Sequence, residues 1–284
     1  MRLRAAALAG GLVLAASAPA RAQSPPCVSP AAVTLADRPG TGRTTSTGGS
    51  ACVAVPGELV IESGWRRQLT DAPAGSTALA SGPLAFLRYG IAKRLEIGIA
   101  PPAAQSRLAT GTTSSDTARG SSDPVFAAKY LIIDRGATQA SVGAAYAPPW
   151  GSGEFTSGLP TYALALNVGT SLSPRVSLAT SLVASTAAGA GESGATRSFF
   201  VFAPSVTLGY ALDAMDTLLL QDAFVSRQGP LLPSGSRGVV ALQRAIGPRL
   251  AADVEYERNF TPLLGTRAQA IGFGIVWIAA PGRR

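Results

Sequence analysis

Apolar and polar residues alternate with a period of two along most of the chain from residue 57 onward. In the segment 84–100, two alternating runs flank the short turn Gly90–Arg94, which is typical of a β-hairpin with one apolar face. Similar runs recur as far as Trp277, and about twelve strands can be counted in all. Most of these runs approach the roughly 9–11 residues that a tilted membrane-spanning strand needs.

The connections between the expected strands alternate between short and long. Short turns are expected at Gly90–Arg94, Asp134–Ala137, Ser173–Arg175, Asp213–Asp216 and Gly247–Arg249. Longer loops are expected at Thr70–Ala78, Pro102–Ser122, Pro148–Gly158, Ala187–Gly194, Arg227–Gly235 and Thr261–Gly265. Bacterial outer-membrane barrels have short periplasmic turns and longer extracellular loops. The pattern therefore predicts an all-β fold, a transmembrane antiparallel up-and-down β-barrel of about twelve strands with both termini in the periplasm.

Composition agrees with a wall that is apolar on one face only. Apolar residues make up 46% of the chain and charged residues 14%, whereas soluble domains carry about 25% charged residues. No uninterrupted apolar stretch beyond the N-terminus is long enough for a membrane-spanning helix. Aromatic residues stand near the ends of the apolar runs, which fits either interface girdles or ordinary strand preference: Trp65, Tyr89, Tyr130, Tyr146, Tyr162, Tyr210, Tyr256 and Trp277.

The first part of the chain is expected to divide into two segments before the barrel. Residues 1–22 have a charged start, an apolar core and a small-residue cleavage site, which predict a signal peptide and export to the outer membrane. Residues 23–56 lack strand periodicity and predict an irregular periplasmic extension, for which a solvated tail is favoured over a plug that folds into the barrel. The barrel itself is expected over residues 57–278.

The chain's two cysteines, Cys27 and Cys52, both lie in this extension. Because an exported protein enters an oxidising compartment, we expect them to form a disulfide. A metal site is the rival interpretation, but the chain contains no histidine and no further cysteine to complete one.

Several segments resemble the MetA-pathway of phenol degradation family, a group of outer-membrane barrels described as transporters. The resemblance rests on GELVIESG, LRYGIAKRLEIGI, GSSDPVFAAKYLI and YAPPWGSGEFTSG, and it extends over roughly residues 57–277. Pro124 departs from the family pattern, as does the chain end beyond Trp277. The resemblance implies a barrel for the passage of small, often aromatic or hydrophobic, compounds, and it supplies no catalytic residues.

Charged residues on the inward parity of the strands are the candidate functional residues. Without histidine, the chain offers no histidine-dependent catalysis, so we expect neither an enzyme nor a cofactor. Charges on the lipid face would cost about 2–4 kcal/mol each, so these side chains should line the lumen. They could pair across strands as structural ladders, or form a constriction that selects solutes by charge: Glu58, Glu62, Arg66, Arg88, Glu96, Lys129, Asp253, Glu255 and Glu257.

The sequence favours a passive outer-membrane channel for small molecules, including hydrophobic or aromatic ones. The alternative is a non-conducting structural or surface-binding barrel that acts through its long extracellular loops. A soluble periplasmic sandwich or lipocalin-like binder is disfavoured, because nearly every strand has an apolar outward face. The expected partners are outer-membrane lipid, small-molecule solutes and the barrel assembly machinery, and no nucleic acid, since the basic residues form no cluster.

Overall fold

The structure is a computed structural model that describes residues 50–73, 75–111, 114–191, 194–227, 229, 234–260 and 267–280. The expected signal peptide 1–22 and most of the expected extension 23–56 lie outside these residues and stay predictions. The strands are β1 (Leu59–Ala72), β2 (Gly75–Ala92), β3 (Leu95–Ala100), β4 (Ala104–Gly111), β5 (Ser115–Ser121), β6 (Val125–Arg135), β7 (Thr138–Ala147), β8 (Thr161–Ser171), β9 (Val176–Ala190), β10 (Thr196–Ala211), β11 (Asp216–Val225), β12 (Gly235–Gly247), β13 (Leu250–Asn259) and β14 (Arg267–Ala280).

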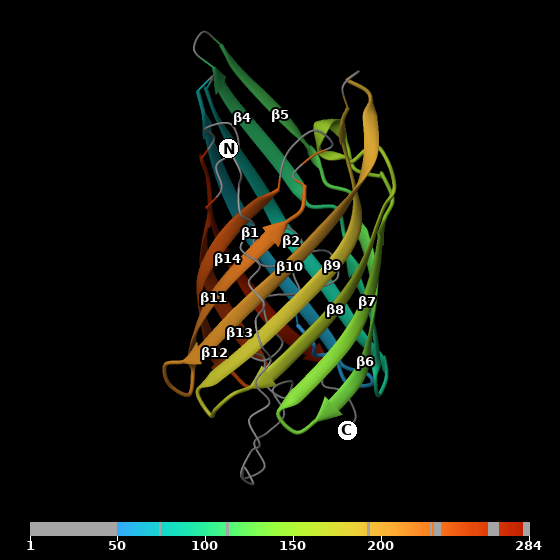
Figure 1. The fold of residues 1–284 in the computed structure, drawn as a ribbon, viewed down its shortest axis with the longest axis vertical. Helices are drawn as coiled ribbons and strands as arrows, with labels where there is room; N and C mark the ends of the chain where they lie inside the picture. The colour runs from blue at the N-terminus through green and yellow to red at the C-terminus, as the bar shows by residue number, and fades with distance from the viewer. Residues whose placement is uncertain are drawn as a thin grey trace, which may run out of the picture.

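The sheet closes on itself because β1 is hydrogen-bonded on both sides. It pairs antiparallel with β14 along one edge and with β2 along the other. The ring then runs β1-β14-β13-β12-β11-β10-β9-β8-β7-β6-β3-β2 and returns to β1, so the barrel has twelve strands (Figure 1). The expected all-β up-and-down barrel is confirmed. Closure leaves no unpaired edge around the wall.

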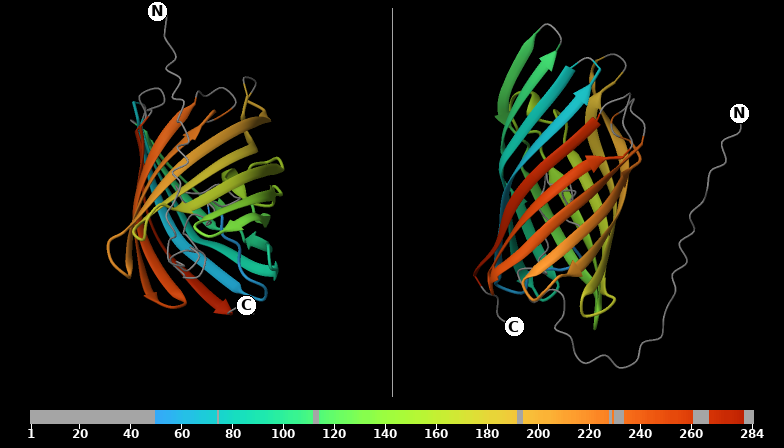
Figure 2. Two further views of the ribbon diagram at one scale, coloured as in Figure 1. Left: turned by 60° about the horizontal axis from the view of Figure 1, so that its bottom comes forward. Right: turned by 90° about the vertical axis from the view of Figure 1, so that its left-hand side faces the viewer.

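The segment expected as the long loop Pro102–Ser122 folds instead into the hairpin β4–β5. The upper part of β2, residues 75–81, pairs with β4, and β5 pairs only with β4. The hairpin therefore stands outside the ring and rises above its rim (Figures 1 and 2). Its strands escaped prediction because largely exposed strands need no apolar alternation.

The connection expected at Thr70–Ala78 is also much shorter in the structure. β1 continues to Ala72 and β2 begins at Gly75. Both strands extend past the apolar part of the wall, β1 mainly with polar residues and β2 mainly with small ones, and hydrophobic periodicity does not detect such extensions. The five expected short turns, by contrast, all coincide with the connections at the opposite end of the barrel.

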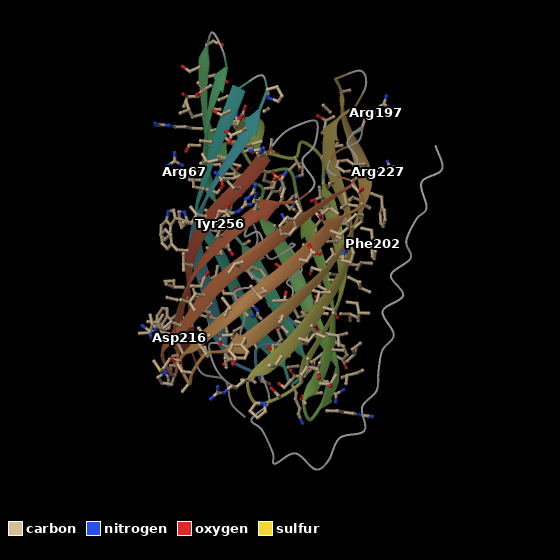
Figure 3. The ribbon with its side chains drawn as sticks, turned by 60° about the vertical axis from the view of Figure 1, so that its left-hand side comes forward. Arg67, Arg197, Phe202, Asp216, Arg227 and Tyr256 are labelled. Carbon is tan, nitrogen blue, oxygen red and sulfur yellow. The ribbon has the colours of Figure 1, made fainter. Side chains whose placement is uncertain are left out.

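The two faces of the wall differ in chemistry. Leu164, Phe200 and Phe273 are among many large apolar side chains exposed on the outside, and Phe202 can be followed in Figure 3. The buried inward positions carry Glu, Arg, Lys, Gln, Asn and Ser together with small apolar residues. No helix in the described part of the chain is long and apolar enough to cross a membrane.

Exposed aromatic residues form a belt near each end of the wall. Tyr89, Tyr130, Tyr210 and Trp277 lie near the strand ends at the short turns, whereas Trp65, Tyr146, Tyr162 and Tyr256 lie toward the other end. Each of these side chains is exposed on the outer face. Two aromatic belts that flank an apolar band are the arrangement of a barrel in a bilayer.

Candidate functional site

A cluster of buried charges lies inside the half of the barrel that bears the short turns. Arg88 on β2 donates from Nη1 to Glu62 on β1 at 3.0 Å, and from Nη2 and Nε to Glu96 on β3 at 2.8 and 3.1 Å. Nζ of Lys129 on β6 lies 3.6 Å from Glu96. The exposed fractions are 0% for Glu62 and 1% for Arg88. Among the residues that the structure describes, each buried charge of this cluster therefore lies beside a charge of opposite sign, as burial requires.

The same side chains bind the backbone of residues 50–55, which lie inside the barrel. Ala54 N–H donates to Glu96 at 2.6 Å, and Cys52 carbonyl accepts from Arg88 at 3.1 Å and from Lys129 at 3.3 Å. Lys129 also donates to the Ser50 carbonyl at 3.1 Å. For residues 50–55 the expectation of a solvated tail is wrong. The charges satisfy backbone groups that would otherwise be buried without partners.

The bound segment, residues 50–55, crosses the lumen between strands that are far apart in the ring. Near β2, a Cβ on Gly90 would overlap the Val55 carbonyl, so only glycine lets the segment pass this close. Farther along, the Cys52 sulfur lies 3.9 Å from the Gln139 side chain on β7, and Ala51 lies beside Gly169 on β8. The segment therefore narrows the lumen at the end with the short turns.

Glu58 stands at the point where this segment joins the wall. Its carboxylate accepts from Val55 N–H at 3.0 Å, and its own N–H donates to the Val55 carbonyl at 2.9 Å. Glu58 is only half-buried and precedes the first residue of β1. It fixes the bend from the wall into the lumen and does not belong to the Arg88 cluster.

A second charged group lies in the opposite half of the barrel. Arg66 on β1 donates to Glu257 on β13 at 3.1 Å, and Arg237 on β12 lies 3.7 Å from Glu257. Asp253 and Glu255, also on β13, are buried on the same inward parity. Apart from Glu58, the candidate charges thus fall into two groups, one around Arg88 that binds residues 50–55 and one on β1 and β13 that contains the Arg66–Glu257 ion pair.

An apolar surface stands across the lumen from this second group. The ring has twelve strands, so strands that are six apart in the pairing order stand opposite each other. On this count β12, β13, β14 and β1 stand opposite β6, β7, β8 and β9, respectively. The inward positions of those facing strands carry a packed cluster of small apolar residues, with neighbours on β6 and β10: Ala145, Ala163, Ala165, Val183, Val125, Ala127 and Ala203. The strands β6–β10 therefore carry an apolar cluster on their inward side, beside buried polar residues such as Asn167 and Ser181, across the ring from the Arg66–Glu257 group.

Asp123 organises the mouth of the barrel, a role that sequence reasoning missed. Its carboxylate accepts from Gly151 N–H and Ser157 N–H, each at 2.7 Å, and from the hydroxyls of Thr156 and Ser157 at 2.8 and 2.6 Å. Burial by itself raises the pKa of the Asp123 carboxyl, but these hydrogen bonds outweigh it and hold the pKa below its usual value. The sequence feature that could have indicated this role is the Asp123-Pro124 pair, which interrupts the strand pattern.

Neither a metal cluster nor a free cysteine is found among the residues that the structure describes. Cys52 is disulfide-bonded. Because Cys27 lies outside the described residues, its pairing with Cys52 stays a prediction. Such a disulfide would lie next to the carbonyl that Arg88 and Lys129 bind, and would tie the preceding residues to the bound segment.

Comparisons with known proteins establish the fold of this chain but do not identify a solute. No family model matches the chain, so the resemblance to the phenol-degradation family stays a prediction. No curated protein matches either. Among solved structures, the chain is similar to an outer membrane channel from Pseudomonas putida F1, with a TM-score of 0.63 and 11% identity over 80% of this chain and 96% of that one.

Two further solved structures share the architecture. The translocator domain of the autotransporter NalP from Neisseria meningitidis has a TM-score of 0.52 and 8% identity over 78% of this chain and 88% of that one. The NanC porin has a TM-score of 0.51 and 11% identity over 76% of this chain and 98% of that one. At such low identity the likeness establishes the barrel fold alone.

Proposed function

We propose that the protein is an outer-membrane channel for the passive passage of small molecules that combine an apolar body with a polar group. The observation that carries this proposal is the presence of two unlike surfaces on opposite arcs of the ring: the ion pairs of Arg66, Arg237 and Glu257, and the alanine and valine cluster. A purely polar pore would hydrate its solutes on every side. Here an aromatic or hydrophobic solute can contact the apolar wall while its polar group faces the charged one.

The outer membrane is the proposed location because the exposed apolar band and the two aromatic belts fit a bilayer. The similarity to an outer membrane channel and a porin is in keeping with this location. No enzymatic role is proposed, and the chain contains no histidine to serve as a general base.

Solute passage can be measured directly in proteoliposomes that contain the full mature chain. We expect swelling rates to rise for small aromatic acids and alcohols, and to be higher than for sugars of equal size. Replacing Ala163 with Arg places a charge in the apolar cluster and should remove this preference, whereas Ala163→Val keeps the cluster apolar and should preserve it. Equal swelling for aromatic solutes and sugars would contradict the proposal.

A second candidate function is a non-conducting barrel that binds a partner at its surface. Two observations favour it: residues 50–55 fill part of the lumen, and the β4–β5 hairpin projects beyond the rim. Proteoliposomes that admit no solute, combined with partner binding that is lost when the hairpin is deleted, would favour this candidate over the channel.

A further inference from the structure

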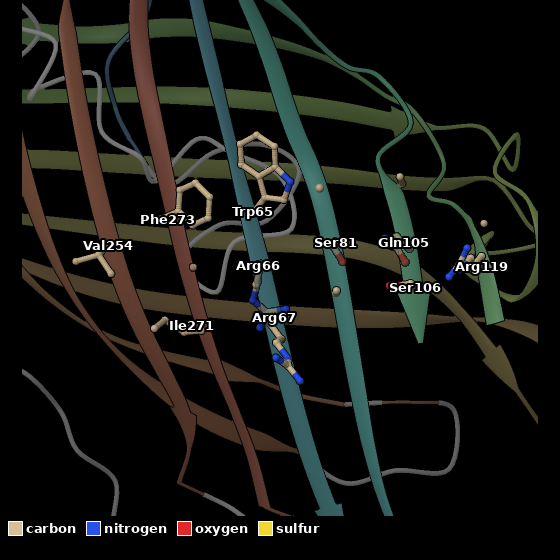
Figure 4. Close-up of a pocket in the computed structure, with 15 residues that line it drawn as sticks. Trp65, Arg66, Arg67, Ser81, Gln105, Ser106, Arg119, Val254, Ile271 and Phe273 are labelled. Carbon is tan, nitrogen blue, oxygen red and sulfur yellow. The ribbon is translucent and has the colours of Figure 1, made fainter. Parts of the chain in front are cut away.

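A groove of about 530 Å³ lies on the outer face of the barrel, toward the end that bears the hairpin. It crosses neighbouring strands from β13 to β5 (Figure 4). On one side, the rings of Trp65 and Phe273 stack with centroids 5.2 Å apart, and Val254 and Ile271 continue the apolar surface. This part of the groove presents aromatic and aliphatic side chains to the surroundings of the barrel.

A local irregularity of the wall makes room for the Trp65 ring. The register between β1 and β2 shifts so that Gly82 and Pro83 together lie opposite Trp65. A Cβ on Gly82 would overlap the indole ring. The glycine therefore lets the indole lie against the wall instead of standing away from it, and this creates the recess beside it.

The other side of the groove carries two arginines that belong to one row of paired residues across four strands. Arg67 on β1 is the register partner of Ala80 on β2, Ala80 is that of Ser106 on β4, and Ser106 is that of Arg119 on β5. These residues form one row, and side chains in a row point to the same face of a sheet. With strands about 4.8 Å apart, the two arginines stand roughly 14 Å apart, separated by the small side chains of Ala80 and Ser106.

The two arginines are available to a ligand. Neither forms a hydrogen bond or ion pair with another residue that the structure describes, and the lining of the groove contains no acidic residue. The neighbouring Arg66 differs, because it points inward to Glu257. The outer face thus carries two unpaired guanidinium groups beside an apolar recess, which complements a ligand with two anionic groups and acyl chains.

We propose that this groove binds a bisphosphorylated glycolipid of the outer leaflet, the lipid A part of lipopolysaccharide. Its two phosphates accept from Arg67 and Arg119, its disaccharide spans Ala80 and Ser106, and its acyl chains lie along Trp65, Phe273 and Ile271. Arginine forks match phosphate oxygens bidentately. The proposal rests on the proposed outer-membrane location, since in such a barrel the end opposite the short turns lies in the outer leaflet.

The test is native mass spectrometry of the full mature chain in detergent, titrated with bisphosphorylated lipid A. Each arginine beside an anionic lipid contributes about fivefold, so R67Q/R119Q should bind about 30-fold more weakly. R67K/R119K keeps both positive charges but loses the bidentate forks, so its affinity should fall between those of the wild type and R67Q/R119Q. R197Q/R227Q is the matched control, because both arginines are exposed at the same end of the barrel but on its other side (Figure 3). The heat-dependent shift in gel mobility verifies that every variant is folded.

The proposal would be overturned by equal binding of lipid A to the wild type and R67Q/R119Q, by an equal loss of binding in R197Q/R227Q, or by equal binding of dephosphorylated lipid A. Binding of phosphatidylglycerol as tightly as lipid A would also overturn it, because the groove would then recognise anionic lipid in general. The measurement needs no solute passage. A protein that binds lipid A but conducts nothing would contradict only the channel, and a conducting protein without this binding would contradict only the lipid site.

Discussion

At the scale of single residues, Glu96 is the side chain on which the interior of the barrel most depends. It accepts from Arg88 through both oxygens, lies within 3.6 Å of Lys129, and accepts the N–H of Ala54. No other carboxylate in the described part of the chain binds both cations and the N-terminal segment.

The substitution Glu96→Gln should release residues 50–55 from the lumen. Removing one charge from a buried ion pair typically costs about 3–5 kcal/mol, because the cations that remain are unpaired. We expect a lower denaturant midpoint and a higher single-channel conductance in planar bilayers. Asp216→Asn, which loses an exposed ion pair with Arg244, serves as the control and should change neither quantity. An unchanged conductance in E96Q would mean that the segment does not limit flow.

Asp123 predicts a pH dependence confined to the mouth of the barrel. Its folded-state pKa lies below the usual 3.8, so its contribution to stability is present above that value and is lost as the pH falls through the lowered pKa. Amide exchange corrected for intrinsic rates should therefore show protection at Gly151 and Ser157 at neutral pH, and at least tenfold less in strong acid. Asp123→Asn should lower protection at neutral pH and abolish the pH dependence, whereas Asp116→Asn should do neither. Protection that persists in D123N would contradict the role of the Asp123 carboxylate in holding Gly151 and Ser157.

At the scale of elements, the β4–β5 hairpin is an appendage of the wall. Its strand pairing with the ring is to the upper part of β2, and β1 still covers the other edge of that strand. The hairpin also binds Ser152 and Glu154, in the connection between β7 and β8. Prolines interrupt the wall at its base, because Pro101, Pro102 and Pro124 fall between β3 and β4 and between β5 and β6. A proline lacks the N–H that a continuing ladder requires.

Replacing residues 104–121 with a short glycine-serine turn should leave the barrel folded. All twelve strands of the ring keep their partners, so the heat-dependent shift in gel mobility should persist with a modest loss of stability. A second deletion variant, with a turn of the same length but with the flanking prolines also replaced, would be a suitable comparison. A deletion variant that no longer shows the mobility shift would mean that the hairpin belongs to the folding core.

At the scale of the whole molecule, the N-terminal segment and the closed wall act as one structure. Residues 50–55 contact inward side chains of β2, β3, β6 and β7. The segment therefore connects strands that are distant in the ring and narrows the passage between them.

Deleting residues 23–55 should raise conductance without dissolving the barrel. The wall keeps every strand, while the Arg88 cluster loses the backbone partners that residues 50–55 supply and is hydrated instead. We expect the conductance of the truncated protein to exceed that of E96Q, in which the segment is loosened but still present. Equal conductance of the truncated and full-length proteins would contradict the view of residues 50–55 as a restriction.

The sequence by itself determined the barrel, its strand number and the end with the short turns. Those features follow from local alternation and from tight turns, which depend on residues adjacent in the chain. It also identified charges such as Arg88 and Glu257, because a charge cannot face lipid cheaply.

Only the tertiary structure decided what those charges contact. The sequence could not show that Arg88 and Lys129 bind the Cys52 carbonyl, since a backbone group has no signature in composition. It also could not place Arg67 and Arg119 in one row, because that alignment depends on the registers of three successive strand pairs. Alternation along a strand is a local property, whereas register and closure bring together residues that are distant in the chain.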